Sequence, residues 1–108
     1  MYLKELTTLC GVSGNENEVF DFIYEKVKDK CDEIYKDNIG NLICVNRGKT
    51  NKKVMLSAHM DEVGLIISKI CDNGFLKFKC VGGIDTRVLI SKKVVVIPRL
   101  SRVNFNKC

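Results

Sequence analysis

The stretch that could do chemistry lies near the middle of the chain, where polar residues follow an apolar run. It reads Leu56-Ser57-Ala58-His59-Met60-Asp61-Glu62-Val63-Gly64 and contains the only histidine among the 108 residues. A neutral imidazole is a good ligand for first-row metal ions, and a nearby carboxylate can hold the second ring nitrogen and so select the tautomer. His59 is therefore a candidate metal ligand, and Asp61 is a candidate orienting group.

The same pattern has a structural alternative. A histidine beside two acidic residues can equally belong to a surface loop that titrates near neutral pH. Pairs of the form H-x-D also arise often by chance, so the spacing by itself is a weak signal for a metal site. On the residues of this stretch alone, both interpretations stay open.

Hydrophobic spacing predicts the elements that must position this stretch. Residues 3–10 have the spacing of a short helix that ends at Gly11. Asn15 and Glu18 have the arrangement of a capping box, which predicts that an amphipathic helix covers residues 16–31. From residue 33 onward the apolar period falls toward two, which indicates strands. The predicted strands are Glu33–Lys36, Asn41–Asn46, Lys53–Ala58, Gly64–Cys71, Phe75–Val81 and Val88–Ile97.

Two of these segments carry more specific patterns. Val54-Met55-Leu56-Ser57-Ala58 lacks polar alternation and is predicted to be a central strand that is buried on both faces. Asn73-Gly74 separates two strand patterns and predicts a hairpin turn. We expect the helix to cover a short sheet built from residues 33–71, with residues 72–97 as a partly detached β segment. The polar stretch would then lie at the carboxyl edge of a central strand, where open α/β sheets bind ligands.

Composition excludes several classes of protein. With 45% hydrophobic residues, 29% charged residues and one proline, the chain is not typical of disordered or fibrous proteins. No apolar run approaches the roughly 20 residues that span a bilayer, and the first residues lack a secretory signal pattern, so we expect no membrane partner and a cytoplasmic location. Six cysteines without a C-x-x-C pair are expected to be reduced and structural rather than paired or zinc-binding.

The charge is unevenly distributed along the chain. The formal net charge is +5, yet residues 1–85 carry −1, and residues 86–108 hold six basic and no acidic side chains. An alternative function is therefore a small non-enzymatic β-rich domain whose basic C-terminal half binds nucleic acid, with two phenylalanines as stacking groups. No nucleic-acid-binding motif is present, so nucleic acid is a disfavoured partner. The residues concerned are Phe75, Lys77, Phe78, Lys79, Arg87, Lys92, Lys93, Arg99 and Arg102.

Four blocks of this chain, in order between residue 3 and about residue 96, resemble one enzyme family. The family comprises the dinuclear-metal aminopeptidases of the glutamyl and deblocking kind, some members of which carry an endoglucanase label. The combination is far more specific than any single block. The blocks are Leu3–Leu6 with Gly11–Glu16, then Asp37–Leu42, then Ser57–Gly64, and finally Gly82–Asp85 with Val88-Leu89.

The resemblance implies an α/β fold class. Residues 1–69 would be the N-terminal part of an aminopeptidase-type α/β/α catalytic domain, and residues 70–97 would be the start of a β-rich dimerisation insert. Residues 98–108 do not resemble the family and are expected to be a tail, either an anion-binding segment or a sequence with no selected role. The family also implies homo-oligomers.

The same resemblance implies a metal-dependent peptidase. Its members remove N-terminal residues from peptide substrates with two divalent ions, zinc or cobalt, which polarise the scissile carbonyl, and with a glutamate as general base. His59 is carried over as a ligand of one metal and Asp61 as its orienting carboxylate. Glu62, Val63 and Gly64 carry over as motif positions only.

The chain departs from the family in its length. Family members are several times longer, and their bridging aspartate, glutamate pair, further acidic ligand and second histidine lie beyond the matched blocks. Nothing after Asp85 is acidic in this chain. We therefore expect at most a partial metal site, a truncated form, and no activity of the 108 residues alone. A further alternative is an interaction-only fragment that pairs with longer relatives through exposed strand edges.

Overall fold

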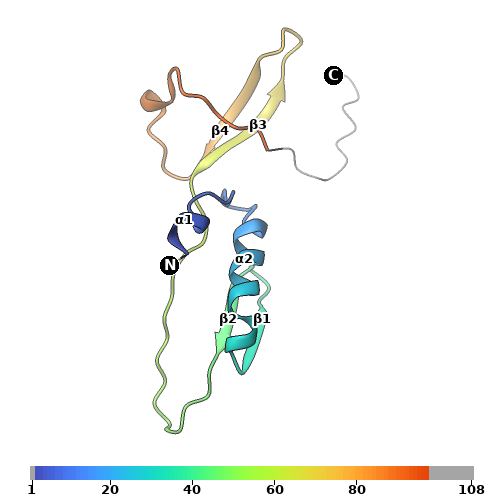
Figure 1. Ribbon diagram of the computed structural model, residues 1–108. Coiled ribbons are helices and arrows are strands. Elements are labelled where there is room, and N and C mark those ends of the chain that lie inside the picture. Colours follow the sequence, from blue (N-terminus) through green and yellow to red (C-terminus); the bar gives the residue numbers. More distant parts are fainter. Residues whose placement is uncertain (1, 98–108) are drawn as a thin grey trace.

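The computed structural model describes residues 2–97 and contains a mixture of short helices and strands (Figure 1). The helical elements are α1 (Leu3–Leu6), α2 (Asn17–Val27) and the two 3-10 helices η1 (Lys28–Lys30) and η2 (Thr86–Leu89). The strands are β1 (Glu33–Lys36), β2 (Leu42–Val45), β3 (Gly64–Ile70) and β4 (Leu76–Val81). The elements form two groups, α2 with β1 and β2, and β3 with β4.

Helix α2 with η1 confirms the amphipathic helix predicted over residues 16–31. Its apolar stripe faces β2, and Val19, which is 5% exposed, is the one buried hydrophobic side chain among residues 2–97. The predicted capping box is wrong. The helix begins at Asn17, and the Glu18 carboxylate accepts from the backbone N–H of Cys10 at 3.2 Å instead of turning back to Asn15. The first helix is also shorter than predicted, since α1 ends at Leu6.

Strands β1 and β2 form an antiparallel hairpin whose register runs from Glu33 opposite Val45 to Lys36 opposite Leu42. The turn between them is organised by Asp37. Its carboxylate accepts from the backbone N–H of Ile39 at 3.0 Å and from the backbone and side-chain amides of Asn41, each at 2.8 Å. This is the Asx type of turn, in which a side chain replaces a backbone acceptor.

Strands β3 and β4 form a second antiparallel hairpin, from Gly64 opposite Val81 to Ile70 opposite Leu76. The predicted turn is confirmed: Gly74 takes a φ of +83°, and its N–H donates to the carbonyl of Cys71 at 2.9 Å. The expectation of one sheet over residues 33–71 is wrong, because β3 pairs with β4 and not with the β1–β2 hairpin. The predicted division at residue 70 falls at the end of β3.

Two further predicted strands are absent. Residues 53–58 are extended, but no other segment of residues 2–97 pairs with them, and Leu56 is 94% exposed instead of buried. Figure 1 shows this part of the chain as a long connection between β2 and β3. Residues 88–97 consist of the end of η2 followed by irregular backbone. An extended segment becomes a strand only when a neighbour bonds its backbone groups, and the apolar pattern does not supply that neighbour.

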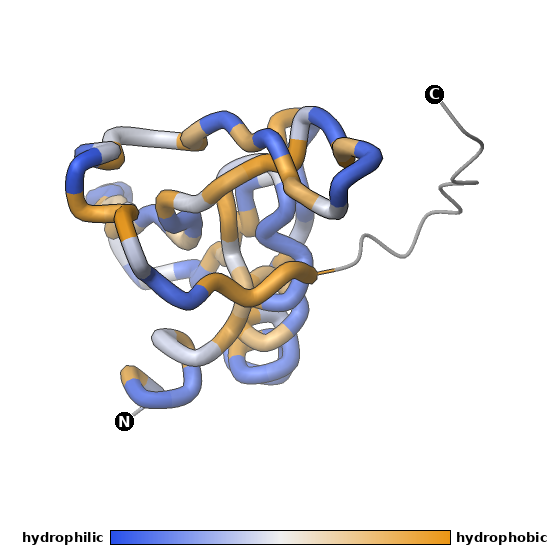
Figure 2. The backbone as a smooth tube through the Cα atoms, turned by 90° about the horizontal axis from the view of Figure 1, so that it is seen from above, coloured by the Kyte–Doolittle hydropathy of each residue, from blue (hydrophilic) through white to orange (hydrophobic). Residues whose placement is uncertain are grey.

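The chain is elongated. Its radius of gyration is 18.5 Å and its extents are 64 × 32 × 23 Å, whereas a compact domain of this length would have a radius of gyration of about 13 Å. Figure 2 shows the last described stretch, residues 94–97, as a continuous hydrophobic run, and its side chains are 42% to 87% exposed. Apolar packing therefore contributes little to the position of the polar stretch.

Three further expectations from the sequence concern membrane segments, the cysteines and the C-terminal tail. No helix among the described residues is long and apolar enough to cross a membrane, and the cytoplasmic location stays a prediction. The cysteines at described positions carry free thiols, and none is buried, so they are not core residues. The predicted tail, residues 98–108, lies outside the described residues.

The exposed extended segment predicts self-association. Replacing Leu56 by lysine removes an apolar side chain from an unpaired strand edge and adds a charge, which opposes edge-to-edge pairing. We expect static light scattering to give a lower mean mass for Leu56→Lys than for the wild type at equal concentration. Asn51→Lys adds the same charge at an exposed polar position and is the control. Equal masses for all three proteins would contradict this expectation.

The Asp37 turn predicts acid sensitivity of the β1–β2 hairpin. Desolvation raises the pKa of Asp37, but hydrogen bonds from Asn41, Ile39 and Gly40 outweigh it and hold the pKa below its ordinary value of 3.8. The carboxylate therefore stabilises the turn fully above about pH 4, and this contribution is lost as the pH falls through the folded pKa.

NMR shifts of the Ile39 and Asn41 amides should follow that loss, and Asp37→Asn should abolish their acid titration. Asp72→Asn, in the turn of the other hairpin, is the matched control and should leave it unchanged. Persistence of the titration in Asp37→Asn would show that another group is responsible.

Candidate functional site

The polar stretch is held by backbone pairing with the segment that follows α1. Val12 and Glu62 form an isolated parallel β-bridge. The N–H of Glu62 donates to the carbonyl of Gly11 at 2.7 Å, and the N–H of Ser13 donates to the carbonyl of Glu62 at 3.2 Å. The Glu62 carboxylate also accepts from the N–H of Gly11 at 3.2 Å. Residues about 50 positions apart are thereby joined next to His59.

Two glycines let these segments approach each other. A Cβ on Gly64 would lie 2.5 Å and 2.7 Å from the two γ-methyl carbons of Val12. A Cβ on Gly11 would lie 2.8 Å from a γ-methyl carbon of Val19 and 3.1 Å from the carbonyl oxygen of Met60. The distances to the valine methyl carbons are shorter than real carbon contacts, so a larger residue at Gly64 would push Val12 away, and one at Gly11 would displace Val19.

Asp61 connects this bridge to the histidine. Its Oδ2 accepts from the Ser13 hydroxyl at 2.5 Å, and its Oδ1 lies 3.2 Å from Nδ1 of His59. The hydrogen bond from Ser13 is the largest influence on the pKa of Asp61 and, together with His59, holds it below its ordinary value of 3.8 against an opposing effect of desolvation. The carboxylate is therefore ionised at neutral pH and accepts hydrogen bonds on both oxygens.

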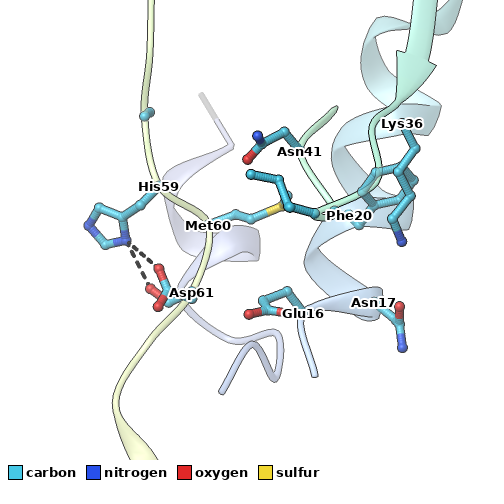
Figure 3. A pocket seen from close by; sticks show the side chains of 11 residues that line it. Glu16, Asn17, Phe20, Lys36, Asn41, His59, Met60 and Asp61 are labelled. Atoms are coloured by element: carbon cyan, nitrogen blue, oxygen red, sulfur yellow. Dashed lines mark hydrogen bonds and ion pairs between the residues drawn. The ribbon is translucent and has the colours of Figure 1, made fainter. Parts of the chain in front are cut away.

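His59 is oriented by oxygen acceptors on one ring nitrogen. Nδ1 lies 3.0 Å from the backbone carbonyl of Asp61 as well as 3.2 Å from its carboxylate. Because both partners only accept hydrogen bonds, they assign the proton of the neutral ring to Nδ1 and leave the lone pair on Nε2. The side chain is 86% exposed and extends from the chain away from Met60 and Phe20 (Figure 3).

A shallow cavity of about 200 Å³ lies between the polar stretch, α2 and the turn after β1. Met60 and Phe20 line it, and the Lys36 ammonium lies 4.5 Å from the centre of the Phe20 ring. Figure 3 shows Met60 directed toward α2 and the His59 ring directed to the other side of the chain. This alternation is that of extended backbone: the imidazole points away from Met60, while His59 and Asp61 still contribute to the lining of the cavity.

The donor set fits one ligand of a metal site and not a complete site. An imidazole whose Nδ1 is held by a carboxylate is a common metal-ligand arrangement. Within residues 2–97, however, no group of three or more His, Cys, Asp or Glu side chains is placed to hold a metal ion. A metal ion bound through His59 would therefore need further ligands from outside the described residues.

Sequence reasoning identified His59 and Asp61, and the structure brings these two together. It missed Ser13 as the partner of Asp61, and it treated Glu62 as a motif position although both its backbone and its carboxylate bind Gly11. The one sequence signal for these contacts was that the blocks Gly11–Glu16 and Ser57–Gly64 occur in the same chain. That pairing is long-range in the sequence, and neither block by itself predicts contact with the other.

Comparison with known proteins identifies a family for this chain. The family model described as M42 glutamyl aminopeptidase matches residues 40–104. A protein of Acetivibrio thermocellus named "Putative aminopeptidase" is 48% identical over 92 residues, which are 85% of this chain and 28% of that protein.

Solved structures agree with this result. A Thermotoga maritima protein titled endoglucanase superposes with a TM-score of 0.79 and 51% identity, over 82% of this chain and 29% of that one. The TET aminopeptidase of Thaumarchaeota archaeon SCGC AB-539-E09 has a TM-score of 0.74 and 32% identity, over 80% of this chain and 24% of that one. The chain thus spans less than a third of the length of these relatives.

The close approach at Gly64 predicts that even one added methyl group weakens the bridge. Overpacking of this kind costs about 1–3 kcal/mol. Because Glu62 N–H is bonded across the bridge, we expect Gly64→Ala to speed its hydrogen exchange by roughly 5- to 150-fold. Gly83→Ala is the matched control, since a Cβ there meets no heavy atom within 4 Å. Unchanged exchange in Gly64→Ala would contradict the tight packing of Val12.

Proposed function

The chain belongs to the M42 glutamyl aminopeptidase family, and on that premise we propose that it carries the N-terminal part of a metal-dependent aminopeptidase. Such an enzyme hydrolyses N-terminal residues from peptides. The observation that carries the proposal is the geometry of His59, whose Nδ1 is held by Asp61 while Nε2 keeps its lone pair. The basic C-terminal half has no comparable support as a nucleic-acid site, and the comparisons favour the peptidase.

His59 would hold one of two divalent ions, zinc or cobalt, through Nε2. Such ions supply Lewis-acid polarisation of the scissile carbonyl. The chain's own contribution is positional: Asp61 orients the imidazole and keeps a negative charge beside it, which favours binding of a cation. Glu62 is turned toward Gly11 and fixes the backbone, so we assign it no role as general base.

We propose that the two groups of elements belong to different parts of the complete enzyme. Residues 1–69 would form part of the catalytic α/β/α domain, and the insert that makes homo-oligomers would begin near residue 70. Support comes from Figure 1, where the β3–β4 hairpin lies apart from α2 and the β1–β2 hairpin. The hairpin itself starts at Gly64, so the connection between the two parts would run through β3.

The 108 residues alone would be inactive. They contain one histidine and no acidic residue after Asp85, and the described part offers no three-ligand cluster. A zinc site for catalysis needs three protein ligands and an open position. His59 could therefore hold a catalytic metal ion only together with further ligands from outside these 108 residues.

This proposal predicts no peptidase turnover by the purified 108-residue chain. We expect hydrolysis of aminoacyl-p-nitroanilides with acidic, basic and apolar N-terminal residues to stay at the blank rate, with either zinc or cobalt added. His59→Ala is the matched control and should give the same blank rate. Metal-dependent turnover by the wild type that disappears in His59→Ala would show that the site is complete and would overturn the predicted inactivity.

A further inference from the structure

Ser13 has the contacts of a residue that acts on His59 through Asp61. Its hydroxyl donates to Oδ2 of Asp61 at 2.5 Å, and the other oxygen of the same carboxylate lies 3.2 Å from His59 Nδ1. The aspartate side chain turns about two bonds, so fixing one of its oxygens also fixes the direction of the other. Ser13 therefore determines where Asp61 presents its acceptor to the imidazole.

The Ser13 hydroxyl is itself held in place by its backbone. The N–H of Ser13 donates to the carbonyl of Glu62, the residue next to Asp61. On the other side, Gly14 takes a φ of +87°, and the N–H of Asn15 donates to the carbonyl of Val12 at 2.7 Å, which closes a tight turn around Ser13. Donor and acceptor are thus fixed relative to each other by hydrogen bonds of the backbone.

The hydroxyl is chemically suited to this role. It donates one proton to a charged acceptor, and a charge-assisted O–H···O bond of this length is among the stronger hydrogen bonds in proteins. Without it, the carboxylate would be free to rotate away from His59 toward water. The imidazole would then keep only the backbone carbonyl of Asp61 as a partner for Nδ1.

We propose that Ser13 is a positioning residue for His59: through Asp61 it maintains the Nδ1–H tautomer of the imidazole and keeps the lone pair on Nε2, the nitrogen that would bind a divalent cation. Only the cation in this statement rests on the proposed function. The tautomer and the orientation depend on the chain's own residues. Removal of such outer partners in metal sites lowers metal affinity about 10- to 100-fold.

The test uses the ring nitrogens of His59, which are unambiguous because the chain has a single histidine. At about pH 8.5, where an ordinary imidazole is neutral, ¹⁵N chemical shifts report the tautomer. We expect Nδ1–H to predominate in the wild type, Ser13→Ala to shift the population toward Nε2–H, and Ser13→Thr to restore it. The amide spectrum of β1 and β2 checks that each variant keeps its fold.

A double-mutant comparison separates this role from a merely structural one. If Ser13 acts through the carboxylate, Ser13→Ala will leave the tautomer unchanged in an Asp61→Ala background. An unchanged tautomer in the single variant Ser13→Ala would overturn the proposal, and so would an equal shift with and without Asp61. A general loosening of the segment would produce the second of these results.

Discussion

The structure depends on the short backbone bridge between Gly11–Ser13 and Glu62. In most domains of this length an apolar core brings distant segments together, but among residues 2–97 Val19 is the single buried hydrophobic side chain. Backbone hydrogen bonds therefore place the polar stretch, with a bond of 2.7 Å from Glu62 to Gly11 as the shortest of them. Two glycines allow the contact, since a Cβ at either position would collide with valine methyl groups.

The chemistry of the site follows from this bridge. Extended backbone alternates its side chains, so His59 and Asp61 lie on one side and Met60 on the other. The bridge brings the Ser13 hydroxyl to Asp61, and Asp61 in turn brings an ionised carboxylate to His59 Nδ1. The arrangement holds one imidazole by Nδ1 and leaves Nε2 for another partner. It agrees with membership of an aminopeptidase family, and the matched region makes up less than a third of each of these relatives.

Local patterns predicted the elements whose stability is local. The apolar stripe that includes Val19 predicted α2, and Asn73-Gly74 predicted the β3–β4 hairpin, because a helix period and a turn can be judged from neighbouring residues. Val54–Ala58 was predicted as a buried strand, yet a strand needs partners from elsewhere, and none pairs with it in the described part of the chain. The helix cap failed for a similar reason, since Glu18 bonds Cys10 in a preceding loop.

The contacts of the candidate site are also of two kinds, one between near neighbours in the sequence and one between distant residues. His59 and Asp61 are two residues apart, so their contact follows from spacing and chemistry alone. Ser13 is 48 residues from Asp61, and only the folded chain shows that the two meet. The matched relatives are also longer than this chain. In the solved structures that share this fold, most of the chain lies outside the matched region.

The bridge itself can be measured directly. Scalar couplings across hydrogen bonds, recorded by NMR on the ¹³C,¹⁵N-labelled chain, connect an amide nitrogen to the carbonyl carbon that accepts its proton. We expect couplings from Glu62 N to the Gly11 carbonyl and from Ser13 N to the Glu62 carbonyl. Couplings within the β1–β2 hairpin, such as Asp37 N to the Asn41 carbonyl, provide the internal reference. Absence of both bridge couplings in a spectrum that shows the hairpin couplings would mean that Glu62 is not paired with Gly11–Ser13.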